Sequence, residues 1–504
     1  MAKEISKLNN YTFLTGKKFQ AWAEEYLEGK DVDILRYFTY CDALFFDELI
    51  QVVGENPGIG LGDAKYIVTR ITSAMVREGL QFQILNENGK EIEEVQTFVQ
   101  SVWDKNLMSA KEVDAEQYAS RKGRGVFILN YSADSKRIII RTIDPEYIWP
   151  IYNEYRELIG YKYIRLTDKT QNGLKVVYRE LYRKTKDKVT KTTGEYVTKK
   201  DKAGLVTWTA TTDTPEKTET LDIDFLPIIH FNNKPGDELE PESDLQSVIT
   251  ALEKLYRNNA DTDETASMEA SPPVVIEGKE PVLRKTKETS SKSIDDIKLL
   301  QKYSLGRGKV IFTGESGNKA YILDVSHLLD ALQTYDNMLT DKLYVNSHLT
   351  RVGAGALAGK DWPAWESLAM ALGPLIDMVT MKHTIRREKY ALLVKFVIRY
   401  GVAKKLVTFT GKIDEVDVSI KFPQVLPASA LREKEFALDA YDKGMYDLET
   451  ALTEIKRSGA DIDIPTVISR VKSQEKLYNE SMQSILDKKP DAVQNEKQEV
   501  SDNL

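Results

Sequence analysis

The sequence contains one cysteine and four histidines among its 504 residues. The single cysteine, Cys41, excludes an intrachain disulfide and a zinc site made of several cysteines, and it favours a reducing compartment for folding. No histidine lies four residues from another or belongs to a cluster with cysteine or aspartate, so we predict no bound metal and no cofactor. We expect packing or surface roles for all four histidines: His230, His327, His348 and His383.

Long apolar runs are missing as well. The longest, around Leu368 to Val379, is too short to span a bilayer and contains Pro374 and Asp377. The opening residues MAKEISKLNN lack the apolar core of a secretory signal. We therefore expect a soluble protein without membrane contact.

Charge of one sign is not in large excess, because the net charge is only −8 at pH 7. This mild balance argues against a protein that coats nucleic acid electrostatically, although it permits one that lets DNA pass without gripping it. The catalytic signatures HExxH, GxSxG and GxxxxGK followed by Ser or Thr are absent too. We therefore expect no enzyme activity.

The chain does contain helices, strands and then long helices, in that order. Amphipathic runs at 18–27 and 62–80 predict helices before the strand-like LQFQIL. Short β-rich runs begin near Arg124, and we expect the Lys- and Thr-rich stretch at 184–204 to be a hairpin tip or a mobile loop. Helices followed by an antiparallel sheet predict an α+β fold.

Two long helices flank a small β-containing insert of some 50 residues. The first is expected to begin at Pro241 and to run for roughly 28 residues, or about 40 Å. The second covers 325–346. The second half of the first helix is polar all round, so it must bridge through solvent or pack on copies of itself.

A glycine-rich loop, residues 347–362, raises the question of a phosphate site. Lys360 follows Gly359, but Asp361 stands where a P-loop needs Ser or Thr, and a helix rather than a strand enters the loop. The dinucleotide fingerprint fails as well, because Ala358 occupies the place of its third glycine. We therefore reject nucleotide binding and expect a mobile loop.

A third long helix is predicted at 363–400, with Pro363 in its first turn. Pro374 lies well inside this helix beside Gly373, and it should kink the helix by removing a backbone hydrogen bond. A strand-like pair, KLVTFTG and VDVSIKF, follows, and three helical segments come after it.

Taken in order, these parts resemble the portal proteins of tailed double-stranded DNA phages, particularly the long-tailed siphophage type. VFILNYSADSKRIIIRTIDPEYIWPIYNE is similar to the wing strands of that family, and FLPIIHFNNKPGDELEPESDLQSVITALEKLY to the entry of its first stem helix. WESLAMALGPLIDMVTMKHTIRREKY is similar to its tunnel helix, and FALDAYDKGMYDLETALTEI to a crown. One departure is Trp365-Glu366-Ser367-Leu368, where family members often carry Ser-Gly.

The resemblance implies an elongated portal subunit with an α/β wing, a long-helix stem, a small β-containing clip, a kinked tunnel helix and a helical crown. The implied boundaries are 1–240 for the wing, to which 401–425 returns, 241–273 and 323–346 for the two stem helices, 274–322 for the clip, 347–362 for the tunnel loop, 363–400 for the tunnel helix and 426–488 for the crown. Residues 489–504 are expected to form a disordered tail.

The resemblance also implies the function. The subunit would be one wedge of a ring, typically of twelve copies, at a single capsid vertex of the virion, and the ring would be assembled in the cytoplasm of the host bacterium. Double-stranded DNA would pass through the ring during packaging and ejection. The implied partners are the terminase large subunit, a head-completion or adaptor protein, and the major capsid and scaffolding proteins.

Site residues follow from the same resemblance. DNA contacts are expected in the tunnel loop at Arg351, Gly353, Gly355, Gly359, Lys360 and Trp362. Channel-lining positions are expected on the first stem helix at Asp261, Asp263, Glu264 and Glu269, and partner docking in the clip at Arg284, Lys285, Lys287 and Lys292. The alternative for both charged sets is a solvated surface.

Two other classes of protein remain open. One is a monomeric nucleic-acid-processing enzyme, which the missing metal and nucleotide motifs disfavour. The other is a scaffold or adaptor protein whose long helices form a coiled coil, which the sheet content and the lack of sustained heptads disfavour.

Overall fold

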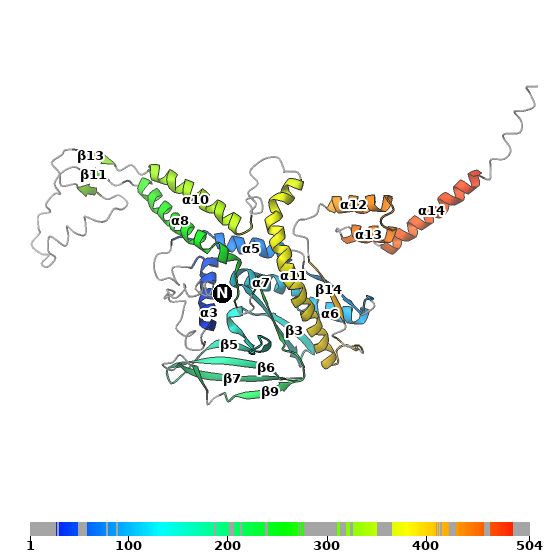
Figure 1. Cartoon of the computed structure of the whole chain (residues 1–504), viewed down its shortest axis with the longest axis horizontal. Helices are drawn as coiled ribbons and strands as arrows, with labels where there is room; N and C mark the ends of the chain where they lie inside the picture. The colour runs from blue at the N-terminus through cyan, green and yellow to red at the C-terminus, as the bar shows by residue number, and fades with distance from the viewer. Residues whose placement is uncertain are drawn as a thin grey trace, which may run out of the picture. The chain divides into compact units, whose positions relative to one another are not determined.

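The computed structural model contains two compact units, residues 1–423 and 424–504, and each is described by itself (Figure 1). None of the helices in the described part of the chain is long and apolar enough to cross a membrane. The structure describes residues 27, 30–48, 58–76, 79–86, 89–185, 188–200, 206–211, 214–236, 240–270, 272, 274–276, 310–312, 319–322, 326–349, 365–409, 411, 413, 416–422, 430–457 and 464–486.

The first unit begins with helices that pack on one another through their apolar sides. In α5, the side chains of Ile67, Ile71 and Met75 recur at helical spacing and are buried, which confirms the helix predicted at 62–80. The other predicted helix, at 18–27, lies outside the described residues except for its last one. The helices are α3 (Lys30–Phe45), α5 (Asp63–Val76), α6 (Glu93–Lys105) and α7 (Met108–Lys122).

A three-stranded antiparallel sheet forms the centre of this unit. Its strand order is β10-β2-β3, with β2 (Arg124–Ser132) in the middle, β3 (Arg137–Thr142) on one side and β10 (Ile228–Asn232) on the other. The first six residues of β2 are all buried. One face of the sheet packs on α7 and on the long helix α11 (Trp365–Ala403), where Tyr390 contacts Phe127 and Phe231. On the other face, His230 contacts Tyr161 of the second sheet.

A second sheet has six antiparallel strands, and it contains most of the stretch at 184–204. The expectation of a mobile loop there is wrong, because β7 pairs with β6 on one side and with β8 and β9 on the other. Val189 and Tyr196 of β7 are buried, and these side chains hold the strand in place despite its many Lys and Thr residues. The strands are β4 (Ile148–Tyr152), β5 (Leu158–Gln171), β6 (Leu174–Thr185), β7 (Lys188–Lys200), β8 (Val206–Ala210) and β9 (Lys217–Leu221).

Of the two strand-like segments predicted after the third long helix, KLVTFTG and VDVSIKF, the second forms a strand, but it does not pair with the first. The described residues 405–409 of KLVTFTG form no strand, whereas β14 (Asp417–Lys421) pairs with β1 (Gln81–Leu85) more than 330 positions earlier in the chain. Phe82 opposes Ile420 in this antiparallel ladder, and both side chains are buried. Burial of the alternating apolar side chains therefore selects a distant partner over a neighbouring one.

The long helices form close to where the periodicity places them. A 3₁₀ turn, η3 (Asp244–Ser247), comes first, and the Ser243 hydroxyl caps it by accepting a hydrogen bond from the Leu245 N–H. The first helix therefore begins at Ile249 rather than at Pro241. The remaining elements are α8 (Ile249–Ala270), α10 (Ser326–Asn346) and the small sheet of β11 (Val274–Ile276), β12 (Val310–Phe312) and β13 (Ala320–Ile322).

The second unit is helical, as predicted. Gly444 ends the first helix with a positive φ of 70°, and the Asp447 carboxylate caps the next helix by accepting a hydrogen bond from the Thr450 N–H at 2.7 Å. Its helices are α12 (Ala430–Asp442), α13 (Leu448–Arg457) and α14 (Ile464–Leu486). The predicted disordered tail lies outside the described residues.

One buried carboxyl predicts a pH dependence of stability. Burial raises the pKa of Glu112 to about 7, although Trp103 Nε1 and the Leu80 N–H donate hydrogen bonds to it. A pKa above the ordinary 4.5 means that the folded state holds the proton more tightly than the unfolded chain does. The contribution of protonated Glu112 to the free energy of unfolding is therefore complete below pH 4.5 and is lost as the pH rises to about 7.

We therefore expect the free energy of unfolding of the wild type to fall by up to about 3 kcal/mol relative to Glu112→Gln between pH 5 and pH 8. Urea unfolding at several pH values measures this difference in slope. Glu94→Gln, at an exposed position on α6, is the matched control and should keep the wild-type slope. Parallel curves for the wild type and Glu112→Gln would contradict the prediction.

Candidate functional site

The long helices α8 and α10, at the positions predicted for the two stem helices, lie side by side (Figure 1). Near one end Ser247 Oγ donates a hydrogen bond to the carbonyl of Asn346 at 3.0 Å, and farther along Asn258 Nδ2 donates to the carbonyl of Leu332 at 3.3 Å. These contacts show that the helices run antiparallel. Apolar packing between them includes the buried Leu339 of α10.

The apolar face of α10 is wider than the part that α8 covers. Val345 is 75% exposed and Leu328 is 59% exposed; Leu328 lies in line with the stripe of the buried Leu339 and Leu343, whereas Val345 lies on a different side of the helix. Met338 and Tyr335 of the same side are exposed as well. Four exposed apolar side chains on one helix of a single subunit favour a contact with another protein chain.

The four acidic candidates of the first stem helix are all on its surface. Asp261, Asp263, Glu264 and Glu269 of α8 are exposed in the subunit. Their exposure agrees with a channel wall and equally with a solvated outer face, so their channel-lining role stays a prediction.

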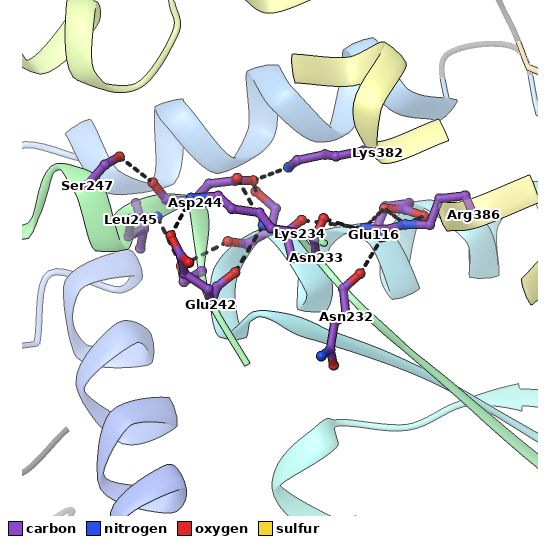
Figure 2. Close-up of polar contacts among 12 residues, drawn as sticks. Glu116, Asn232, Asn233, Lys234, Glu242, Asp244, Leu245, Ser247, Lys382 and Arg386 are labelled. Atoms are coloured by element: carbon purple, nitrogen blue, oxygen red, sulfur yellow. Dashed lines mark hydrogen bonds and ion pairs between the residues drawn. The ribbon is translucent and has the colours of Figure 1, made fainter. Parts of the chain in front are cut away.

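Near the start of α8, a buried ionic network joins α11 to α7 and to the end of β10 (Figure 2). Arg386 of α11 is fully buried and pairs with Glu116 of α7, with Nε at 2.8 Å from Oε1 and Nη2 at 3.0 Å from Oε2. Its Nη1 donates to the carbonyl of Asn232 at 2.5 Å, and its guanidinium lies over the Phe231 ring at 4.5 Å. The planar guanidinium thus contacts α7 and β10 at once.

A second ion pair lies one helical turn away. Lys382 Nζ is 2.5 Å from Asp244 Oδ2, and Ser120 Oγ donates to the same oxygen at 2.7 Å. Burial alone would raise the pKa of Asp244, but the charge and hydrogen bond of Lys382 hold it below its usual value. Asn233 connects the two pairs, because its Nδ2 donates to Asp244 at 2.9 Å and its Oδ1 accepts from Arg386 at 3.4 Å (Figure 2).

We call these residues the junction: Glu116, Ser120, Asn233, Asp244, Lys382 and Arg386. Each of them is at most 3% exposed. They come from α7, the end of β10, the turn that enters the stem and the long helix α11. A shift of α11 relative to the stem would therefore separate buried charges, so the junction holds these elements in one arrangement.

Sequence reasoning missed the junction. The available signal was the pair Lys382 and Arg386, which place two cations four residues apart on a helix with a largely apolar surround. A charged stripe on a buried helix indicates acidic partners, but only the tertiary fold shows that these are Glu116 and Asp244.

A half-buried cluster of carboxylates has the donor set of a metal site. Asp42, Asp144 and Glu146 each offer an oxygen, and the three oxygens lie within 4.8 Å of one another. The Lys122 ammonium lies among them, at 2.8 Å from Asp42 Oδ2, 2.6 Å from Asp144 Oδ1 and 3.1 Å from Glu146 Oε2. Burial disfavours the charged ammonium, but the three carboxylates outweigh it and raise the pKa of Lys122. The lysine ammonium therefore neutralises these carboxylates in the place that a metal ion would occupy.

Most of the predicted contact residues fall outside the described part of the chain. This applies to the tunnel-loop set (Arg351, Gly353, Gly355, Gly359, Lys360 and Trp362) and to the clip set (Arg284, Lys285, Lys287 and Lys292). Gly373 and Pro374 lie inside α11, which continues through them from Trp365 to Ala403. The kink at Pro374 stays a prediction.

Comparison with known families identifies the chain. The model of the family described as "Phage portal protein, SPP1 Gp6-like" matches residues 21–464. This match, on an α+β fold with long paired helices, defines the class as phage portal proteins. Within that class, the chain belongs to the SPP1 Gp6-like family. A search of curated proteins finds no match.

Solved structures of gene transfer agent (GTA) particles contain similar chains. One comes from the virion of a native GTA particle, with 11% identity, coverage of 83% of this chain and 93% of that chain, and a TM-score of 0.44. Another comes from the neck of a native GTA particle computed with C12 symmetry. It has 12% identity, coverage of 83% of this chain and 93% of that chain, and a TM-score of 0.43. A third comes from the neck of an empty GTA particle computed with C6 symmetry. It has 11% identity, coverage of 78% of this chain and 90% of that chain, and a TM-score of 0.44.

Proposed function

We propose that copies of this chain close into a ring of about twelve subunits at one capsid vertex, as the family resemblance implies, and that double-stranded DNA is packaged and ejected through it. The observation that carries the proposal is the exposed apolar face of α10, which one subunit cannot bury. Closure of identical copies around a channel supplies that burial for every subunit. The ring is assembled in the host cytoplasm and remains in the virion.

The electrostatics of such a ring suit passage rather than binding of DNA. Twelve copies with a charge of −8 each would carry about −96, and acidic residues of α8 facing the channel would repel the phosphates. The basic residues of the tunnel loop, Arg351 and Lys360, would make short-lived contacts with the duplex. The clip cations would dock the terminase large subunit and later the head-completion protein, and the outer surface would meet the capsid and scaffolding proteins.

The proposed role is structural, not enzymatic. The buried acidic clusters in the described residues are filled by lysine or arginine side chains, so they leave no carboxylate pair facing a substrate. A processing enzyme would predict a monomer with its own catalytic activity, and a coiled-coil scaffold would predict a rod. Electron micrographs of the purified protein separate these alternatives, because only the portal predicts a ring with a central channel.

The face of α10 provides the sharper test. We expect Met338→Asp to shift the protein from rings to single subunits, because it places a charge in the apolar contact between neighbouring copies. Sedimentation velocity and negative-stain images measure the fraction of rings. Gln333→Asp is the control, since it adds the same charge at an exposed polar position of the same helix.

In the expected result, Gln333→Asp keeps its rings, and Met338→Asp keeps the far-UV spectrum of the folded wild-type chain. Intact rings in Met338→Asp would argue against this face as the contact between copies. Single subunits in the wild type at micromolar concentration would argue against the portal ring itself.

A further inference from the structure

A pocket of about 240 Å³ lies in the wing, between α11 and the two sheets. Four residues of α11, at positions 389, 392, 396 and 399, form one wall, and their spacing places them on one face of the helix. The segment from 225 to 230, which enters β10, forms the floor, and the adjoining ends of β5 and β6 complete the pocket. No role is assigned to it by the ring, the channel or the junction.

The interior of the pocket is apolar. Phe225 and Phe396 stack at 4.2 Å between ring centroids, and both are buried, as is Leu226. His230 adds no charge there, because burial lowers its pKa well below the usual value. Both of its ring nitrogens are engaged, with Tyr152 Oη at 2.9 Å and Tyr161 Oη at 2.7 Å.

The charged residues of the pocket all have the same sign. Lys184, Lys389 and Arg399 line it, and none of its twelve described lining residues is an aspartate or a glutamate. Arg399 is partly compensated by Asp224 outside the lining, with Nη1 at 3.6 Å from an oxygen of a largely exposed carboxylate. Lys184 is exposed and Leu392 is 37% exposed, so a ligand can reach the pocket from solvent.

We propose that this pocket binds an amphipathic carboxylate, which is an apolar group joined to a carboxylate. The apolar part would lie against Phe225, Leu226 and Phe396, where it replaces water on an apolar wall. The carboxylate would lie near Lys184, the exposed lysine at the end of β6, which provides a charge-assisted hydrogen bond. Such a ligand is either a free molecule or a segment of a partner protein that carries an apolar side chain beside acidic residues.

Isothermal titration calorimetry on the assembled protein tests the proposal with defined probes. Octanoate represents the free molecule, and a blocked tetrapeptide with one phenylalanine between acidic residues represents the protein segment. We expect at least one of them to bind, and the tighter one indicates the source. Octan-1-ol, which has the same chain without the charge, should bind at least about tenfold more weakly than octanoate if octanoate is the tighter probe.

Three substitutions at exposed positions locate the site. Lys184→Glu should raise the Kd about fivefold or more, and Leu392→Glu should abolish binding, because it puts a carboxylate at the apolar entrance. Lys188→Glu is the matched control, since Lys188 is an exposed lysine near the same hairpin tip that does not line the pocket. Its Kd should stay at the wild-type value.

Three results would overturn the proposal: no heat from either probe, equal binding of octan-1-ol and octanoate when octanoate is the tighter probe, or equal weakening by Lys184→Glu and Lys188→Glu. Ring formation is measured on the same samples, and it should be unchanged in all variants. Loss of rings without loss of binding would count against the portal ring and leave the pocket supported.

Discussion

Replacing Arg386 with methionine is expected to lower the free energy of unfolding by about 3–5 kcal/mol. The substitution removes the only positive charge in direct contact with Glu116 in the described structure, and it leaves that carboxylate buried. It also removes the donor to the carbonyl of Asn232. Urea unfolding followed by tryptophan fluorescence measures the loss at constant protein concentration.

The neighbouring arginine provides the control. Arg387 is exposed on the same turn of α11, so Arg387→Met should change stability by less than about 0.5 kcal/mol. The double variant Arg386→Met with Glu116→Leu removes both charges, and we expect it to be more stable than Arg386→Met alone because no ion remains unpaired. If the double variant were the less stable of the two, lost packing rather than an orphaned charge would be the cause.

A second large effect is expected at Lys122. Lys122→Met leaves Asp42, Asp144 and Glu146 within reach of one another without the ammonium that separates their charges. We expect a loss of about 3–5 kcal/mol at pH 7, again measured by urea unfolding. Lys105→Met, at an exposed position at the end of α6, should have little effect.

The geometry of these carboxylates gives the prediction a specific signature. Their oxygens lie close enough to ligate one ion, so millimolar Ca²⁺ should restore part of the stability of Lys122→Met and should leave the wild type unchanged. KCl at matched ionic strength controls for screening. Equal responses of the wild type and the variant to Ca²⁺ would show that the cluster does not take up the ion.

The sequence predicted the helices of this fold better than its strand pairings. Apolar spacing in α5, α10 and α11 is a local property, so it placed these helices within a few residues of their observed ends. The partner of β14 is β1, and nothing near β14 in the sequence specifies it, because strand pairing depends on burial between distant segments. The stretch that contains β7 was predicted to be a hairpin tip or a mobile loop; the hairpin is confirmed, but the length of the strand was missed because its Lys and Thr residues hide the buried Val189 and Tyr196.

The candidate site also contains residues that the sequence predicted and residues that it did not. The family resemblance led to surface residues, such as Asp261 on α8, whose positions follow from a helix alone. The junction was not predicted, because Arg386 and Glu116 are 270 positions apart and acquire their roles only when α11 packs on α7. Lys382 and Asp244 are 138 positions apart. Buried ion pairs of this kind are properties of the packing, and a charge pattern indicates only one half of each pair.

The lone cysteine makes the protein suitable for selective chemical labelling. Cys41 is fully buried, and burial raises the pKa of its thiol to about 12, so the thiolate that reacts with maleimides is scarce at neutral pH. A cysteine introduced at an exposed position would therefore be the reactive one without any removal of Cys41. A fluorophore at an exposed position such as Lys105 could thus be attached selectively to an otherwise native chain.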